Sequence, residues 1–450
     1  MKLRPTSLSG LVLAALAWLP RPALPQQAPQ PLTLELVLRA AVERHPLVEA
    51  AEARVRGARG ARSTARALPN PVFTYQVENA AFPGGAAPVG LDRETSVLAT
   101  LPLEPLWQRW SRTSRAGAEL RWADAALALA RRDVVLDAAR AFYRVALAQV
   151  SVRGAADIEE SLDSLVRFNR TRVAEGVAAE GDLIRVEVER DRATTERALQ
   201  EAELARARAE LLPFLGDTPR TSAMLASLVV AVHDSVMGAG AVLPPEGELT
   251  ARALTLRPDV VAARARARAA GAETGYQRAL LVRQLGLTFG AKTTGGVRSM
   301  VAGLSLPIPL FDQNRGEIGR AAGERTAAER ELAWTERRAV AEVAGAYEAA
   351  RVLGAQVSRL HEGFLGRAEE ARRVALAAYQ EGAVPLFHII DATRTLAEAR
   401  LSYYRALFAE REGVLELYAA SGLDVLGPFT AGTPTPGTVS AQVSPTGVTR

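Results

Sequence analysis

The segment LGLTFGAKTTGGVRSMVAGLSLPIPLFDQNRGEIGRA, residues 285–321, decides the fold. Apolar side chains alternate with small or polar ones from Leu285 to Phe289. This period of two predicts a β-strand over about residues 284–291, followed by a glycine-rich turn and a return strand over about residues 299–306. The segment is therefore expected to begin with a β-hairpin.

A long helical hairpin is predicted directly after the strands. Pro307 and Pro309 interrupt the strand ladder because proline has no backbone N–H to donate. No proline occurs between Gly316 and Glu381, so this stretch is predicted to be one helix of up to about 95 Å, at about 1.5 Å per residue. Gly382 then marks a short turn, after which a second helix returns.

The return helix carries two adjacent apolar stripes, which predicts neighbours on two sides. Helices with two seams can curve into a tube, and the alternative is a buried helix of an ordinary bundle. The stripes consist of Leu386, Ile389, Thr393, Leu396, Tyr403 and Leu407, and of Phe387, Ile390, Ala397, Leu401, Tyr404 and Phe408.

The same order of elements occurs twice in the chain. The pair Leu101-Pro102 matches Leu306-Pro307 at a shift of 205 residues, and Gly176 matches Gly382 at a shift of 206 residues. The first copy is therefore expected to contain its own strand pair, long helix, glycine turn and return helix. We interpret the protein as a duplicated unit of about 200 residues.

Four strands in one chain are too few to close a barrel. An open sheet edge does not survive in lipid, because each unsatisfied backbone group there costs several kcal/mol. Three chains would supply twelve strands and twelve helical positions, enough for a barrel with a lumen. The sequence thus predicts a mixed fold, a trimeric twelve-stranded membrane β-barrel continued by a long coiled-coil α-helical barrel. The alternative is a small soluble four-stranded sheet.

The composition excludes several classes of protein. With no cysteine among 450 residues, disulfides, zinc ribbons, iron–sulfur clusters, cysteine nucleophiles and a lipid-bearing N-terminal cysteine are ruled out. The 55 basic residues are interleaved with 50 acidic ones, which argues against binding of nucleic acid. No catalytic, nucleotide-binding or cofactor motif is visible, so neither an enzyme nor a cofactor is expected.

The four histidines do not predict a metal site, because none lies in H-x-x-x-H or H-E-x-x-H spacing. They are His45, His233, His361 and His388. Only His388 lies at a predicted hairpin tip, where a transient metal contact or a pH response is the alternative to a structural role.

The N-terminus is predicted to be a secretory signal peptide, because a basic start precedes an apolar stretch too short to span a membrane. No later segment reaches that length either. The expected parts of the chain are the signal peptide (1–28), a first repeat (29–216, strands about 72–79 and 94–101), an equatorial linker (217–247), a second repeat (248–422) and a tail expected to be disordered (423–450).

Several stretches resemble the TolC-type outer-membrane efflux proteins, the trimeric exit ducts of tripartite pumps. They are LTLELVLRAAVERHPLVEAAEARV (32–55), RVAEGVAAEGDLIRVEVE (172–189), GLSLPIPLFDQNRGEIGRA (303–321) and YQEGAVPLFHIIDATRTLAEARLSYYRAL (379–407). The third, with its PLFDQNRGEI run, is most similar to the branch that serves cobalt-zinc-cadmium or copper-silver exporters.

The resemblance implies a homotrimer whose strands share one barrel in outer-membrane lipid and whose helices form a periplasmic tunnel. It also implies two protein partners, a periplasmic adaptor (membrane fusion protein) and an inner-membrane pump of the resistance-nodulation-division type. The expected function is passive conduction of heavy-metal cations. The alternatives are a drug-efflux or type I protein-secretion duct of the same family and, more distantly, a secreted coiled-coil scaffold.

The resemblance places the functional residues at the two hairpin turns. The residues expected to dock the adaptor are Arg172, Gly176, Asp182, Leu183, Tyr379, Gly382 and Ile389. The residues expected to form the periplasmic gate are Glu175, Glu180, Glu381 and Asp391. Three copies of each acid would make rings that attract cations, and the alternative for any one of them is a solvated helix end.

Overall fold

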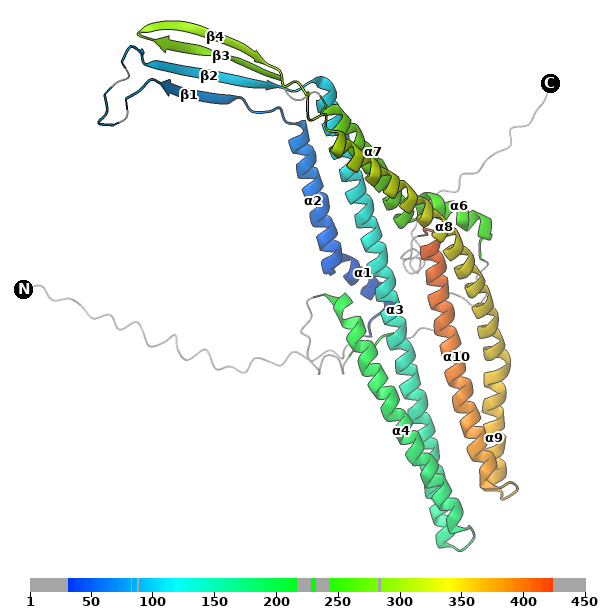
Figure 1. The fold of residues 1–450 in the computed structure, drawn as a ribbon. Helices are drawn as coiled ribbons and strands as arrows, with labels where there is room; N and C mark the ends of the chain where they lie inside the picture. Colours follow the sequence, from blue (N-terminus) through cyan, green and yellow to red (C-terminus); the bar gives the residue numbers. More distant parts are fainter. Residues whose placement is uncertain are drawn as a thin grey trace, which may run out of the picture.

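The computed structural model of the chain describes residues 31–81, 83–86, 89–216, 228–231, 243–281 and 285–423. The predicted signal peptide lies outside the described residues, as do most of the predicted equatorial linker and all but Leu423 of the predicted tail. Figure 1 shows a sheet at one end of the molecule and long helices that run from it to two turns at the other end. None of the helices in this described part has an apolar stretch long enough to cross a bilayer.

The strands form one antiparallel sheet in the order β1-β2-β3-β4. Their ends differ from the predicted ranges by up to about three residues. The sheet joins the two copies, because β2 of the first copy pairs with β3 of the second. Within the described chain, β1 and β4 each have one neighbour, so both lateral edges of the sheet are open. The strands are β1 (Val72–Glu78), β2 (Glu94–Leu103), β3 (Leu285–Thr294) and β4 (Val297–Ser305).

The predicted end of the second strand at about residue 101, just before Pro102, is wrong, because β2 continues through Pro102 to Leu103. Pro102 lies opposite Gly286 of β3. The partner strand on the other side, β1, ends where Val72 faces Thr100, so β2 has a free side at Pro102. Proline is tolerated on such a free side because no neighbour there requires its missing N–H.

The register gives the sheet one apolar and one polar face. Directly paired residues of an antiparallel sheet point to the same face. One row across all four strands is Phe73, Ala99, Phe289 and Ala302, and a row of the opposite face, three residues further along each strand, contains Gln76, Ser96, Lys292 and Ser299. The apolar face is strongly exposed in a single chain, with Phe73 at 76% and Met300 at 86%. An exposed apolar surface of this kind marks a membrane or protein contact.

The first copy contributes α1 (Leu34–Arg44), α2 (Pro46–Arg66), α3 (Leu106–Ala174), α4 (Glu180–Leu211) and the short turn η1 (Leu212–Leu215). The second contributes α6 (Glu246–Leu256), α7 (Pro258–Ala279), α8 (Arg315–Arg359), α9 (Gly366–Gln380) and α10 (Leu386–Ala420). Proline starts both α2 and α7, where its missing N–H would be unpaired in any helix.

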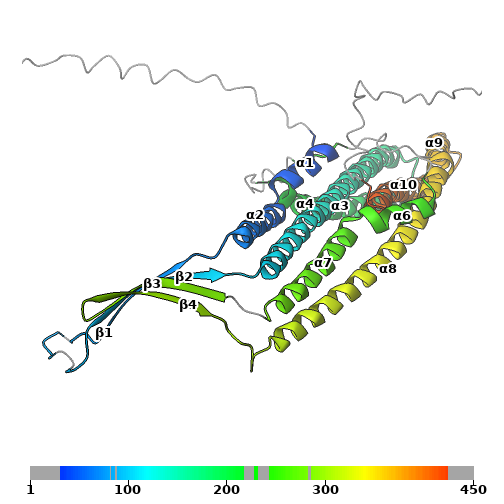
Figure 2. The ribbon, with the colours of Figure 1, turned by 90° about the horizontal axis from the view of Figure 1, so that it is seen from above.

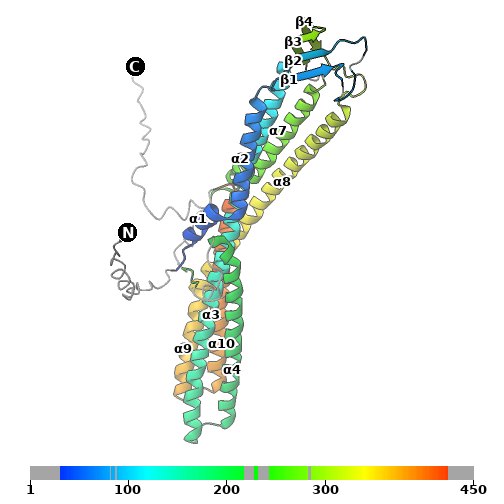
Figure 3. The same ribbon diagram turned by 90° about the vertical axis from the view of Figure 1, so that its left-hand side faces the viewer.

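The helices nearest the sheet, α2, α3, α7 and α8, lie side by side (Figures 2 and 3). In the half nearest the sheet the contacts run α2–α3–α7–α8, and in the half nearest the turns they run α4–α3–α10, with α8 and α9 beyond α10. One lateral edge of the chain therefore consists of β1, α2 and α4, and the other of β4, α8 and α9.

The predicted two-stripe helix is α10, and its first stripe is the more completely buried. Leu386, Ile389 and Leu396 of that stripe are at most 3% exposed. In the second stripe Phe387 is exposed, whereas Leu401 and Tyr404 line a cavity. One stripe thus packs inside the chain and the other is only partly covered.

The prediction of one uninterrupted helix from Gly316 to Glu381 is wrong. Between α8 and α9 the backbone forms a single π-helical turn, Leu360–Leu365, called the π-turn below. Its sequence, LHEGFL, contains no proline, and so the interruption has no strong breaker as its signal. The corresponding helix of the first copy, α3, is continuous over 69 residues.

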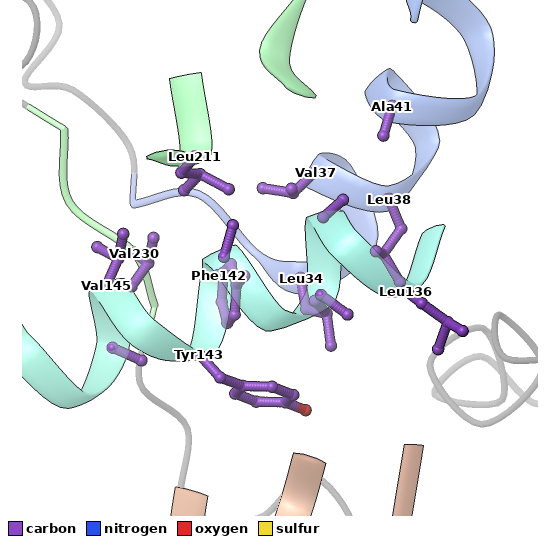
Figure 4. Packing of buried hydrophobic residues seen from close by; sticks show 14 of the residues in the cluster. Leu34, Val37, Leu38, Ala41, Leu136, Phe142, Tyr143, Val145, Leu211 and Val230 are labelled. Carbon is purple, nitrogen blue, oxygen red and sulfur yellow. The ribbon is translucent and has the colours of Figure 1, made fainter. Parts of the chain in front are cut away.

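The hydrophobic core is divided along the length of the molecule. The largest cluster lies at mid-height, where α1 and the end of α4 pack on α3; Leu38, Val145 and Leu211 are fully buried there (Figure 4). A separate cluster lies at the turns, between α3, α4, α9 and α10. The middle of the molecule and the end with the turns are therefore stabilised by different contacts.

A buried ion network holds α7 to α8 and to the end of α10. Arg257 is 1% exposed and pairs with both carboxylate oxygens of Asp259, at 2.8 and 2.9 Å. It also pairs with Glu342 of α8 and donates to the Ala420 carbonyl oxygen at 3.4 Å. Because these partners come from three helices, the network fixes where the second copy's helices cross.

Asp259 is stabilised in its ionised form by this network. Burial by itself works to raise the pKa of Asp259, but the hydrogen bonds from Arg257 and the charges of Arg257 and Arg132 outweigh burial and lower it. A carboxyl with a lowered folded-state pKa stabilises the protein above its unfolded pKa of about 3.9, and that contribution is lost as the pH falls through the folded-state value.

We predict that Asp259→Asn lowers the free energy of unfolding by about 3 kcal/mol at neutral pH, because Arg257 would lose a buried partner. The difference from the parent protein should shrink as the pH falls below about 4, since the carboxyl is protonated first in the unfolded chain and, at lower pH, also in the folded parent protein. Urea denaturation at several pH values measures both. Asp137→Asn is the control, because this 63%-exposed acid pairs only at the surface with Arg140. Equal effects of the two substitutions would contradict the prediction.

Candidate functional site

The two hairpin turns have the same backbone structure. Gly176 and Gly382 adopt positive φ values of 73° and 76°, which side-chain-bearing residues rarely adopt. After the first, the Val177 N–H bonds back to the Arg172 carbonyl oxygen at 2.9 Å, and after the second the Ala383 N–H makes the equivalent bond at 2.8 Å. Both turns are thus Schellman caps that end a helix and reverse the chain.

The two hairpins pack on one another just above the turns, through the tip cluster. It contains Leu162, Leu165 and Val166 of α3, Val186 of α4, Tyr379 of α9, and Leu386, Ile389 and Ile390 of α10. Since both hairpins contribute buried side chains, neither tip is free to move without the other unless this cluster opens.

A polar contact crosses the tip cluster. The Tyr379 hydroxyl donates a hydrogen bond to Asn169 Oδ1, and Asn169 Nδ2 donates to the Leu165 carbonyl oxygen at 2.9 Å. The Arg172 guanidinium lies 5.6 and 5.7 Å from the ring centroids of Phe168 and Tyr379. The group formed by Phe168, Asn169, Arg172 and Tyr379 is called the tip latch, because it joins α3 of one hairpin to α9 of the other.

The residues predicted to dock the adaptor divide into two groups. At the surface, exposed or half-buried, are Arg172, Gly176, Asp182 and Gly382. Within or against the tip cluster are Leu183, Tyr379 and Ile389. Tyr379 is 5% and Ile389 1% exposed, so their side chains hold the hairpins together and do not offer a surface to another protein.

The predicted gate acids lie at the outer surface of the turns. Glu175 and Glu381 are the C-caps of α3 and α9, where a negative charge is unfavourable beside the helix dipole. Glu180 lies in the first turn of α4, where a negative charge is favourable. Asp391 is exposed on α10. The position of the two C-cap acids is therefore not explained by helix stability.

Ion pairs connect the hairpins above the turns. Arg394 of α10 pairs with Glu189 of α4, and Arg170 pairs with Glu187 at 2.8 Å within the first hairpin. These pairs are partly exposed, so each contributes at most about 1 kcal/mol and is screened by salt. These ion pairs contribute little to stability and mainly favour one position of the helices relative to one another.

Several exposed apolar side chains lie at the tips, and none of them is among the residues predicted to dock the adaptor. Val177, Ile184 and Val188 are 60%, 54% and 59% exposed at and after the first turn, and Phe387 is 58% exposed after the second. Their signal in the sequence is weak, because an apolar residue beside an apolar stripe looks like part of that stripe. Exposed together near two turns, they are suited to contact another helix.

The polar face of the sheet is the second feature of functional interest. Glu94 pairs with Lys292 across β2 and β3, and the hydroxyls of Thr100 and Thr288 lie 3.0 Å apart. These interactions link the two copies of the repeat on the polar face. A polar wall behind an apolar face is the arrangement of a strand that lies between water and lipid.

Two of the histidines pack against aromatic rings. His45 caps α2 and stacks on Phe214 at 5.5 Å, and His361 lies 5.5 Å from the Tyr403 ring. His388 is exposed beside Phe387, and His233 lies outside the described residues. Among the residues that the structure describes, no three histidine, aspartate or glutamate side chains come together as a metal site.

The two copies of the repeat correspond to the two matches of a known protein family. The family described as outer membrane efflux protein matches residues 37–217 and 249–423. The chain is 27% identical over 388 residues to the cobalt-zinc-cadmium resistance protein CzcC of Cupriavidus metallidurans, covering 86% of this chain and 89% of that protein. It is 26% identical over 185 residues to the cation efflux system protein CusC of Escherichia coli, covering 39% and 40% of the two chains.

Solved structures share the fold. The outer membrane protein VceC of Vibrio cholerae superposes with a TM-score of 0.71 at 19% identity, covering 87% of this chain and 96% of that one. The outer membrane channel CmeC of Campylobacter jejuni superposes with a TM-score of 0.72 at 13% identity, covering 96% of both chains. At these identities the likeness establishes the arrangement of sheet and helices.

We predict that Gly382→Val destabilises the second turn by about 1–2 kcal/mol or more, because a β-branched residue is strained at positive φ. No heavy atom lies within 4 Å of a Cβ built at Gly382, so the effect isolates backbone strain. Gly345→Ala is the control, since this glycine lies in α8 with equally open space. Thermal denaturation should show a lower midpoint for the first variant only, and equal midpoints would contradict the prediction.

Proposed function

Because this chain belongs to the outer membrane efflux protein family, we propose that three copies of it form the exit duct of a tripartite efflux pump. The strands lie in the outer membrane and the helices extend into the periplasm. The duct itself uses no energy, and transport is driven by an inner-membrane pump. The observation that carries this proposal is a sheet with one apolar face, one polar face and two open edges.

The open edges require further chains. Unpaired N–H and C=O groups on β1 and β4 would each cost several kcal/mol in lipid, so each edge must pair with a strand of another protomer. The helices would pair between protomers in the same way, with α2 and α4 of one protomer next to α8 and α9 of its neighbour. A ring of three protomers closes the strands into one β-barrel and the helices into one helical barrel. Its apolar sheet face then contacts lipid, and its polar face lines the lumen.

The proposed substrate class is heavy-metal cations. The supporting observation is the match to CzcC, named as a cobalt-zinc-cadmium resistance protein, which extends over most of both chains. The match to CusC, named as a cation efflux protein, covers a smaller part. The alternatives are a drug-efflux or type I protein-secretion duct of the same family.

The hairpin tips are the proposed contact with a periplasmic adaptor. Arg172, Asp182 and the two turn glycines are accessible there, and the exposed Val177 and Phe387 add apolar surface. We assign Glu175, Glu180, Glu381 and Asp391 to the periplasmic opening, where three copies of each concentrate negative charge. Such charge favours the entry of cations over anions.

The tip latch is proposed to keep the periplasmic end closed. Opening the duct requires the second hairpin to move away from the first, which breaks the hydrogen bond between Tyr379 and Asn169. Both groups are buried, so the closed state gains from a contact that water does not easily replace. An adaptor that binds the open tips would shift the equilibrium toward the open state.

We predict that cells without this protein lose tolerance to zinc, cobalt, cadmium or copper salts while tolerance to hydrophobic drugs is unchanged. Accumulation of the metal, measured by mass spectrometry of washed cells, should rise and return to normal on complementation. Native mass determination of the detergent-extracted outer-membrane protein should give roughly three times the mass of one chain. Drug sensitivity without metal sensitivity would favour the alternative substrate class, and a soluble monomer would contradict the duct.

We predict that Tyr379→Phe makes the closed state less stable by about 1–3 kcal/mol, because Asn169 loses its buried partner. Single-channel recording in planar bilayers should show more frequent opening with the same open conductance. Tyr347→Phe is the control, since this tyrosine packs at the α6–α8 core away from the tips. Unchanged opening in Tyr379→Phe would contradict the latch while leaving the duct itself untouched.

A further inference from the structure

The second copy of the repeat has one more residue in its long helix than the first copy has. Arg115 at the start of α3 matches Arg320 at a shift of 205 residues, but Gly176 at its end matches Gly382 at a shift of 206 residues. α3 is a continuous α-helix, whereas the matching helix contains the π-turn Leu360–Leu365. A π-turn accommodates one additional residue within an α-helix. The extra residue of the second copy is therefore taken up at the π-turn.

The buried positions show why the π-turn is needed for packing. Val343, Ala350 and Val357 of α8 are buried at a spacing of seven residues. The next residue that packs inward is Leu365, which follows Val357 by eight residues and contacts the small cluster around Ala368. One extra residue in a regular helix would turn the following side chains by about 100°. The π-turn absorbs this rotation, so that α9 still faces α10.

Packing around the π-turn is sparse. None of its six residues is buried. The clusters on either side of it are separate, with the tip cluster nearer the turns and the mid-height clusters nearer the sheet. Between them Ala368 and Ala399, both small, form part of a minor cluster with Leu396. Gly363 and Gly366 further weaken the helix here, because glycine has a low helical propensity.

The neighbouring helix α10 has room to move at the same level. It has no break of its own, so it must tilt as a rod if the second tip moves. On one side it contacts the π-turn, where the rings of Tyr403 and His361 lie 5.5 Å apart. On another side Ala397 and Leu401 of α10 line a cavity of about 130 Å³, which α3 and α4 complete. An unfilled, mostly apolar cavity costs few contacts when a helix shifts into it.

We propose that the π-turn is the hinge about which the second hairpin tip swings when the duct opens. α8 stays with the clusters at mid-height, while α9 rotates and the continuous α10 tilts with it as a rod. The first hairpin has no such turn and serves as the fixed side. This inference rests on the proposed function as a gated duct, and it assigns the motion to one place in one of the two copies.

Deletion of Gly363 tests the hinge. It removes one residue from the π-turn and leaves a regular helix in which Leu365, Ala368 and Tyr379 keep their orientation toward α10. The variant trimer should assemble and denature at the same temperature as the parent or a higher one. In planar bilayers its opening frequency should fall about tenfold or more, with unchanged open conductance. Metal accumulation in cells should rise correspondingly.

Two further variants keep the test decisive. Deletion of Gly154, in the continuous α3, should rotate Leu162 and Leu165 out of the tip cluster and prevent assembly. The double substitution Gly363→Ala and Gly366→Ala stiffens the π-turn without shortening it and should also reduce opening. The added Cβ at Gly363 meets only the flexible end of Arg367, at 3.2 Å.

The outcomes separate the hinge from the duct. Normal opening and normal metal export in the Gly363 deletion would overturn the hinge, and so would failure of this deletion to assemble, because the register argument requires that it fold. Parent protein that forms no channel in bilayers would instead overturn the proposed function. Reduced opening in both Gly363 variants, with parent-like stability, is the result we expect.

Discussion

The rest of the structure depends on the pairing of β2 with β3. This ladder, from Glu94 opposite Thr294 to Leu103 opposite Leu285, is where the two copies of the repeat meet in the sheet. It fixes the lateral order of everything attached to the strands, because α3 follows β2 and α8 follows β4 after short corners. A slip of one residue would exchange the apolar and polar faces of a strand. The need to keep apolar side chains on one face therefore fixes the register of the pairing.

The side-by-side arrangement of the four strands continues in the helices. Two copies give two strands each, and at every level of the helical part the chain is again a row of neighbours with two uncovered sides. Alanine at buried positions such as Ala321, Ala328 and Ala339 of α8 allows the helices to approach closely. A wall one helix thick has little interior, which explains why its core is a series of small clusters.

Much of this architecture could be predicted from local patterns. Alternation from Leu285 to Phe289 located a strand, the glycine turns located the ends of the hairpins, and the repeat allowed each element to be predicted twice. The neighbour of Ile389 could not be predicted, because two stripes on α10 do not reveal which stripe faces the other hairpin. Tyr379 lies on α9, outside both stripes. The π-turn was missed because it has no proline, although the change in shift from 205 to 206 residues recorded the extra residue.

The division of the core has a consequence for gating. In a globular domain a moving segment disturbs one continuous core, and the whole stability of the domain opposes the motion. Here the tip cluster and the mid-height cluster share few contacts, while the Arg257–Asp259 network anchors the second copy's helices at mid-height. The tips can therefore rearrange at the cost of the tip cluster, the latch and the partly exposed ion pairs between the hairpins. A thin wall with separate clusters suits a duct whose β-barrel end keeps its structure while the end formed by the hairpin turns opens.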